Sequence, residues 1–152
     1  MQDPLARAAR ASFAPERARR SLEHLAESSP SAREGLERAG EAFLKHLADL
    51  ILISPPMLES LTGHPEWIGW LGDNLSREMK REGKRPESSL EAWREWRAQA
   101  GRAADAIDLL RAFKRREYLK ISCLDVSGLI SFEETVGRLS NLADLMIAEA
   151  LS

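Results

Sequence analysis

Residues 131–150 read SFEETVGRLSNLADLMIAEA, and this stretch decides the fold class. Ser131 and Glu134 have the spacing of a capping box, in which each side chain accepts a hydrogen bond from the other residue's backbone N–H at the start of a helix. The apolar residues that follow recur at helical intervals and are Phe132, Val136, Leu139, Leu142, Ala143, Met146 and Ala150. The stretch therefore predicts an amphipathic α-helix with these residues on its buried side.

The preceding segment predicts either one long helix or two shorter ones. Ser88 and Glu91 repeat the capping-box spacing, and apolar residues continue at helical intervals over residues 90–124. Gly101 interrupts this run, and glycine costs about 1 kcal/mol relative to alanine inside a helix, so a break or bend is expected there. Gly128 marks the end of the segment.

The N-terminal half contains four further predicted helices, because proline and serine stand where helices can begin. They are a helix from Pro15 to about Ser28, a helix from a capping box of Ser31 and Glu34 up to Pro55, a short helix from Pro55 that Gly63 ends in a left-handed conformation, and a helix from Pro65 to Gly83. Strict alternation of apolar and polar residues is missing, which argues against strands. The fold class is therefore expected to be all-α, a bundle of about six or seven helices without a sheet.

Length and composition predict a single domain that spans residues 1–152. The chain is 43% hydrophobic and 30% charged, which is the balance of an ordinary globular protein. Residues 83–89 are polar and lack periodicity, so they are expected to form a mobile loop.

Charge and hydropathy argue against several classes of partner. The formal net charge is -2, so no long-range attraction for nucleic acid is expected. The longest apolar run, residues 50–53, is far shorter than the roughly 20 residues of a membrane span. Cys123 is the only cysteine, and no N-terminal signal peptide is evident, so a cytoplasmic location is expected.

Catalytic, cofactor-binding and metal sites are not expected in this chain. His24, His46 and His64 lie on different predicted elements, and no second cysteine provides the spacing of a zinc site. A glycine-rich phosphate loop is also missing. Cys123 lies between Ile121 and Leu124 on an apolar face, where a small buried core residue is the favoured interpretation.

The most informative segment for function is LLRAFKRREYLKI, residues 109–121. Five basic residues and one acidic residue occupy the ten positions from 111 to 120. The candidate contact residues are Arg111, Lys114, Arg115, Arg116 and Glu117, with Phe113 and Tyr118 as neighbouring aromatic surface. One carboxylate cannot offset five cations, so an acidic partner is one interpretation and a solvated helix face is the other.

Three stretches resemble the bacterial glutamate–ammonia-ligase adenylyltransferases, which adenylylate and deadenylylate glutamine synthetase. They are SPPMLESLTGHPEWIGWL at 54–71, LRAFKRREYLKISCLDVSGL at 110–129 and SFEETVGRLSNLADLMI at 131–147, in the order that the family has them. In that family these helices precede a nucleotidyltransferase domain. The resemblance therefore implies a non-catalytic helical segment whose partners are such a domain, in cis or in trans, and glutamine synthetase.

The resemblance does not extend to a catalytic centre. Enzymes of this kind hold two magnesium ions with an Asp-x-Asp pair after a glycine-rich turn, and this sequence has no such pair. Asp105 and Asp108 are three apart on a predicted helix. Mg²⁺ and ATP are thus expected only on the nucleotidyltransferase domain, and the chain alone is expected to be inactive. A stand-alone helical interaction adaptor is the alternative.

Overall fold

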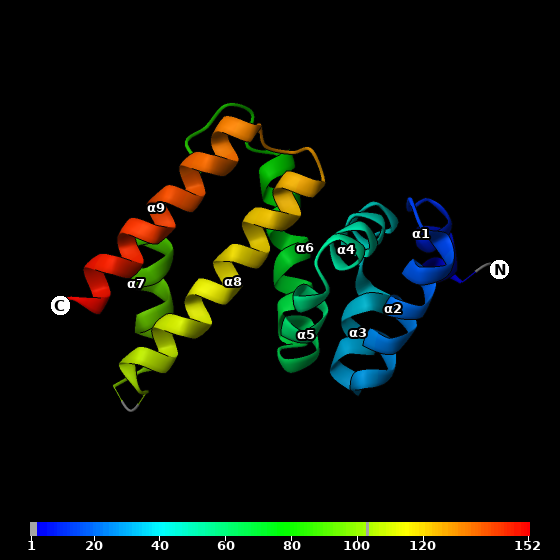
Figure 1. Ribbon diagram of the computed structural model, residues 1–152, viewed down its shortest axis with the longest axis horizontal. Helices are drawn as coiled ribbons and strands as arrows, with labels where there is room; N and C mark the ends of the chain where they lie inside the picture. The colour runs from blue at the N-terminus through cyan, green and yellow to red at the C-terminus, as the bar shows by residue number, and fades with distance from the viewer. Residues whose placement is uncertain (1–2, 103) are drawn as a thin grey trace. The chain divides into compact units, whose positions relative to one another are not determined.

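The computed structural model describes residues 3–102 and 104–152, and every regular element in those ranges is an α-helix (Figure 1). The contacts within the chain divide it into two compact units, Met1–Met79 (unit 1) and Lys80–Ser152 (unit 2). A single domain over residues 1–152 stays a prediction. The all-α prediction is confirmed, but the described residues form nine helices rather than six or seven.

Unit 1 consists of six short helices that pack mainly through α2 and α4. They are α1 (Pro4–Arg10), α2 (Pro15–Ser28), α3 (Pro30–Arg38), α4 (Glu41–Ile53), α5 (Pro55–Gly63) and α6 (Glu66–Met79). The sequence did not predict α1, a helix of only 7 residues. It forms because Asp3 caps it by accepting a hydrogen bond from the backbone N–H of Leu5 at 3.0 Å, while Ala8 and Ala9 are buried.

The helix predicted over residues 31–53 is two helices, and its predicted capping box is wrong. Pro30 takes the first helical position, so Ser29 becomes the cap and accepts a hydrogen bond from the N–H of Ala32 at 3.0 Å. Ala39 and Gly40 are extended and separate α3 from α4. α3 packs closely against α6, because a Cβ added at Gly35 would lie 3.3 Å from the side chain of Ile68.

Two helix ends in unit 1 also differ from the prediction. Gly63 is the last residue of α5 and is not left-handed, and His64, at φ −134° and ψ 70°, is the residue that ends the helix. α6 ends at Met79 rather than Gly83, and Met79 is 67% exposed. After Met79 the chain is no longer helical, and Glu82 and Gly83 both have positive φ.

Unit 2 contains the loop 80–88 and three helices, α7 (Ser89–Ala100), α8 (Ala106–Val126) and α9 (Phe132–Ala150). The capping box of Ser88 and Glu91 is confirmed, with both reciprocal hydrogen bonds present. Gly101, at φ +74°, breaks the helical run over residues 90–124, as its low helix propensity predicted. Loop 80–88 includes residues 83–88 of the segment predicted to be mobile, whereas Ser89 is the first residue of α7. The mobility of the loop stays a prediction.

The core of unit 2 lies among all three helices. It is built from Ala92, Trp93, Phe113, Ile121, Leu142 and Leu145, with Trp96, Leu109, Leu110, Leu139 and Met146 packed against it. One part of the sequence prediction for α9 is wrong. Phe132, Val136, Ala143 and Ala150 are exposed, because α9 turns Leu142 and Leu145 toward α7 and α8 instead.

Candidate functional site

α8 carries the basic segment, and local hydrogen bonds set where this helix begins and ends. Asp105 Oδ1 accepts hydrogen bonds from the N–H groups of Ile107 at 2.9 Å and Asp108 at 3.1 Å. Beyond the last turn, Gly128 adopts φ +72°, a conformation that favours glycine. Asp105 and Asp108 therefore serve the helix start.

One side of α8 packs against α7 through aromatic rings. Phe113 is fully buried, and its ring centroid lies 5.1 Å from that of Trp93 at an interplanar angle of 62°. Trp96 adds a second contact at 6.1 Å. Edge-to-face pairs of this kind add about 0.5–1.5 kcal/mol beyond the burial of area. This packing fixes the rotation of α8 about its axis, and Phe113 is thereby part of the core rather than of the surface.

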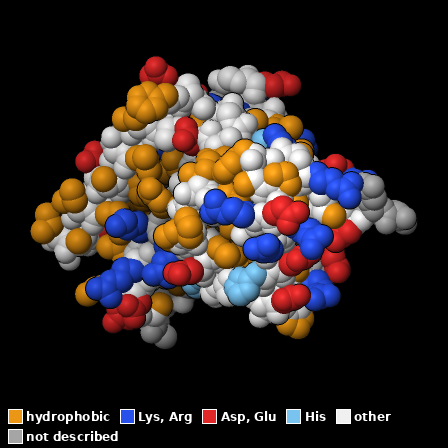
Figure 2. Space-filling view, turned by 45° about the vertical axis from the view of Figure 1, so that its right-hand side comes forward, with side chains coloured by type: hydrophobic (Ala, Val, Ile, Leu, Met, Phe, Trp, Pro, Cys, Tyr) orange, Lys and Arg blue, Asp and Glu red, His pale blue; other side chains and the backbone are white. Residues whose placement is uncertain are grey.

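Three cations lie on the exposed side of α8 and are called the basic face: Arg111, Lys114 and Arg115. With Tyr118, which is 46% exposed, they fall within about 100° of helix circumference. Arg111 lies 3.6 Å from Asp108, and both side chains are more than 70% exposed. Across residues 3–102 and 104–152, Lys114 and Arg115 make no ion pair. Figure 2 shows Lys and Arg side chains at the lower left, where the first half of α8 runs.

Arg116 turns in the opposite direction and covers an aromatic ring. Its guanidinium carbon lies 4.1 Å from the ring centroid of Trp96, and its side chain is 14% exposed. Burial lowers the pKa of Arg116, while the carboxylates of Glu117, Glu87 and Glu95 act in the opposite direction. The side chain stays charged at neutral pH because the pKa of arginine is very high.

Glu117 and Lys120 form a buried ion pair one turn further along α8. Lys120 Nζ lies 2.6 Å from Glu117 Oε2, and their side chains are 11% and 3% exposed, respectively. Arg116 Nη2 approaches the other carboxylate oxygen at 3.7 Å. Moving each ion out of water costs several kcal/mol, and Glu117 offsets part of this cost for both cations. Arg116, Glu117 and Lys120 are called the inner cluster.

A pocket of about 210 Å³ opens beside the inner cluster and has walls of both charges. Its lining includes Arg85, Ser88, Glu117, Lys120, Arg138 and Asn141. The cations already have carboxylate neighbours, since Arg85 lies 2.8 Å from Glu91 and Arg138 lies 3.5 Å from Glu134. The pocket therefore offers little uncompensated charge to an anion.

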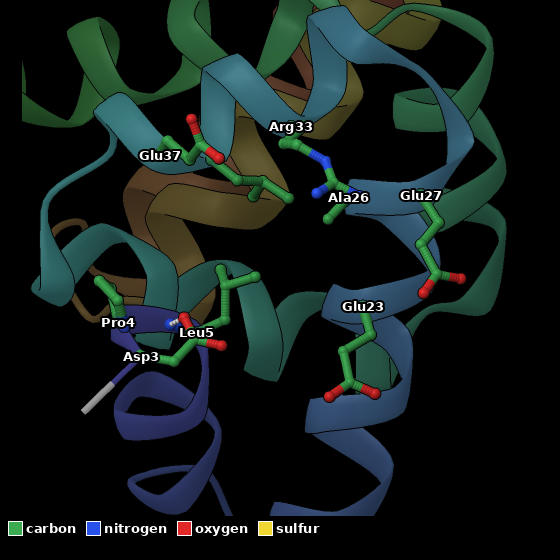
Figure 3. Close-up of a pocket in the computed structure, with 9 residues that line it drawn as sticks. Asp3, Pro4, Leu5, Glu23, Ala26, Glu27, Arg33 and Glu37 are labelled. Atoms are coloured by element: carbon green, nitrogen blue, oxygen red, sulfur yellow. Dashed lines mark hydrogen bonds between the residues drawn. The ribbon is translucent and has the colours of Figure 1, made fainter. Parts of the chain in front are cut away.

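Unit 1 has a second pocket, of about 250 Å³, beside α1, α2 and α3 (Figure 3). Carboxylates dominate its rim, and Glu23 and Glu27 project from successive turns of α2. Glu23 pairs with Arg19 at 3.3 Å, and Arg33 also lines the pocket. Within the described parts of the chain, no three His, Cys, Asp or Glu side chains are grouped as a metal site.

The single cysteine has the buried environment that the sequence predicted. Cys123 is buried, and burial raises the pKa of its thiol to about 12, so the reactive thiolate is disfavoured at neutral pH. Trp67 and Trp93 are buried, whereas Trp70 and Trp96 are half-buried. No helix in the described ranges combines the length and the apolar character needed to cross a bilayer.

The structure divides the five predicted contact residues into two groups. Arg111, Lys114 and Arg115 come together on the exposed side, whereas Arg116 is largely buried and Glu117 is 2% exposed. A contact of these residues with a partner stays a prediction. Sequence reasoning missed the stacking of Arg116 on Trp96, because the spacing of residues along α8 does not show which helix lies beside Arg116.

Comparison with known proteins connects this region to one family. A family model described as glutamate-ammonia ligase adenylyltransferase matches residues 44–152, which include the whole of α8 and α9. Neither the curated proteins nor the solved structures provided a match.

Proposed function

Because the chain belongs to the glutamate–ammonia ligase adenylyltransferase family, we propose that it acts as a docking domain that presents a nucleotidyltransferase domain to glutamine synthetase. The proposed role is non-catalytic, since the sequence contains no Asp-x-Asp pair to hold the metal ions of nucleotidyl transfer. In this proposal Mg²⁺ and ATP bind to the nucleotidyltransferase domain.

The basic face of α8 is the observation that carries the proposal. Arg111, Lys114 and Arg115 are exposed together on a helix whose opposite side is held by the ring contacts of Phe113. Like charges at three- and four-residue spacing weaken a helix by a few tenths of a kcal/mol per pair. An acidic partner surface removes this repulsion, and charge complementarity also speeds association.

Charge reversal on the basic face tests the proposal. The variant Lys114→Glu/Arg115→Glu is compared with Arg94→Glu/Arg102→Glu, which makes the same change in net charge at two exposed positions outside that face. Calorimetry measures binding of each chain to the nucleotidyltransferase domain and to glutamine synthetase from the same organism. We expect the basic-face variant to bind at least about tenfold more weakly, a loss of about 1.4 kcal/mol, and the matched variant to stay within about twofold of wild type.

Three other results would contradict the proposal in different ways. If both variants bind as tightly as wild type, the basic face is only a solvated surface. Wild type that binds neither protein would favour a stand-alone adaptor. Magnesium-dependent incorporation of labelled AMP into glutamine synthetase by this chain alone would refute its non-catalytic role.

A further inference from the structure

α9 has an uncovered apolar side in addition to its core side. Phe132 is 75% exposed, Val136 45% and Ile147 60%, and Ala143 between them is also exposed. Their spacing of four, seven and four residues places them in one row along the helix, which is called the apolar stripe. Single exposed apolar residues are common on protein surfaces, but an aligned row of them is typical of an interaction surface.

The apolar stripe faces away from α7. α9 turns Leu142 and Leu145 into the core of unit 2, and its Glu149 pairs with Arg97 of α7 at 3.4 Å. At about 100° per residue, Val136 and Ile147 lie roughly 160–180° around the helix from Leu145 and about 120–140° from Leu142. Phe132 lies about 140° from Leu145 and about 80° from Leu142. Seen from α7, Val136 and Ile147 are thus on the far side of α9, and Phe132 is at the edge of that side.

The basic face also points away from α7, so it shares one side of the α8–α9 hairpin with the apolar stripe. Arg111, Arg115 and Tyr118 lie about 140–160° around α8 from Phe113, whose ring contacts α7, and Lys114 lies about 100° from it. The two helices pack side by side (Figure 1), and Thr135 Oγ1 donates a hydrogen bond to Asp125 Oδ1 at 2.9 Å where they join. Figure 2 shows hydrophobic side chains next to Lys and Arg side chains in this region.

We propose that the apolar stripe of α9 and the basic face of α8 form one docking surface, and that its occupant is a surface of the nucleotidyltransferase domain made of an apolar ridge bordered by carboxylates. This inference rests on the proposed function and extends it, because apolar contacts rather than charge pairs supply most of the affinity. Fully desolvated anchors, aromatic residues among them, dominate binding at protein interfaces, whereas ion pairs at the exposed rim chiefly affect association rate and orientation.

Charge complementarity determines the chemistry of the occupant. Cations line the α8 edge of this surface, while Glu133 and Asp144 are exposed along the opposite edge of the apolar stripe. An anionic membrane would be attracted to the first edge and repelled by the second. A folded protein can place carboxylates opposite the basic face and no carboxylates opposite Glu133 and Asp144. The charges of a protein surface can therefore complement both edges.

The chain offers a closely matched pair of variants for the test. Phe132→Ser/Ile147→Ser removes the two most exposed large side chains of the apolar stripe, which are 75% and 60% exposed. Phe13→Ser/Ile53→Ser removes the same two residue types in unit 1, where they are 65% and 60% exposed. Calorimetry measures binding of each 152-residue chain to the purified nucleotidyltransferase domain from the same organism, in 0.15 M and 0.5 M salt.

We expect Phe132→Ser/Ile147→Ser to bind at least about tenfold more weakly at both salt concentrations, because loss of apolar contact is not screened by salt. The unit 1 variant should stay within about twofold of wild type. All chains should keep their melting temperatures, since the substituted side chains are exposed. Lys114→Glu/Arg115→Glu should lose binding mainly in 0.15 M salt.

The two variants of unit 2 separate this inference from the proposed function. If Lys114→Glu/Arg115→Glu loses binding and Phe132→Ser/Ile147→Ser does not, the apolar stripe is no part of the docking surface and the proposed function stands. If wild type does not bind the domain, both proposals fail. A wild-type dimer in light scattering that Phe132→Ser/Ile147→Ser converts to monomer would make a second copy the occupant. Binding to phosphatidylserine vesicles that is lost in Phe132→Ser/Ile147→Ser would make a membrane the occupant. Either result overturns the inference.

Discussion

The five cations of residues 111–120 lie in two different environments on the same helix. Those of the basic face are exposed, whereas Arg116 and Lys120 of the inner cluster are 14% and 11% exposed in their side chains. Water screens the first group, so each exposed pair is worth about 0–1 kcal/mol. The second group is stable because Glu117 and the ring of Trp96 replace the lost hydration.

This difference separates folding from binding along one segment. Substitutions in the inner cluster should change the free energy of unfolding, and substitutions on the basic face should change association with a partner. The same residue type therefore has different consequences one or two positions apart, depending on which side of α8 it occupies.

Removal of Glu117 should have the largest effect on stability. Glu117→Ala leaves Lys120 and Arg116 without their shared buried carboxylate, and breaking such a pair costs about 3–5 kcal/mol. Urea denaturation followed by circular dichroism measures the loss. As a control, Glu117→Leu/Lys120→Met replaces the pair with apolar groups and should recover much of it. A wild-type unfolding midpoint for Glu117→Ala would show that the inner cluster is not coupled to the fold.

Truncation of Arg116 should have an intermediate effect. Arg116→Ala removes the cation over Trp96 and the packing of its aliphatic stem, a loss of about 1–2 kcal/mol. Arg116→Lys keeps the charge but not the flat guanidinium, so it should recover only part of this loss. Thermal melts of the three proteins give the order. Equal melting temperatures for Arg116→Ala and wild type would show that Arg116, like the basic face, contributes little to stability.

Charge reversal on the basic face should scarcely change stability. Lys114→Glu/Arg115→Glu changes exposed side chains that have no ion pair in the described ranges, so the free energy of unfolding should stay within about 0.5 kcal/mol of wild type. Unfolding in 0.15 M and 0.5 M salt measures this directly. A large destabilisation would mean that the two sides of α8 are not independent.

Glu91 provides a smaller test, at a surface site whose charge is nevertheless tied to the fold. Its carboxylate accepts hydrogen bonds from the N–H of Ser88 at 2.9 Å and from Arg85 at 2.8 Å, which lower its pKa to about 2. A lowered folded-state pKa stabilises the fold above pH 4.5, the ordinary value, and this contribution disappears as the pH falls toward 2. The stability difference between wild type and Glu91→Gln should therefore shrink between pH 6 and pH 3 in urea titrations. A constant difference would show that the charge of Glu91 is immaterial to the cap.

Helix starts and stops were predictable at several positions where a neighbouring residue decides them, but not at Gly63, which is not left-handed, or at Gly83, since α6 ends at Met79. Pro15 begins α2, Ser88 and Glu91 cap α7, and Gly101 separates α7 from α8, because each acts within one turn of its own position. The prediction failed where two local signals competed. Pro30 moved the start of α3 back to Ser29, and α1 is too short for periodicity to reveal it.

The candidate site was predictable as a basic segment but not as two sides of a helix. The charge density of residues 111–120 is visible in the sequence, and so is the close spacing of Arg111, Lys114 and Arg115. Spacing does not show which side of the helix a neighbour will cover. Trp96 lies on another helix, and only its position beside α8 turns Arg116 inward.

The sequence by itself determined the helical fold class and most helix boundaries, because capping, proline geometry and glycine conformation act within a few residues. Tertiary structure alone decided which apolar side of α9 is buried. Phe132 and Val136 are as apolar as Leu142 and Leu145, so α9 is apolar over a wide arc that one core contact cannot cover. α7 and α8 approach from the side of Leu142 and Leu145, and the other apolar residues stay exposed because no described helix of unit 2 packs over them.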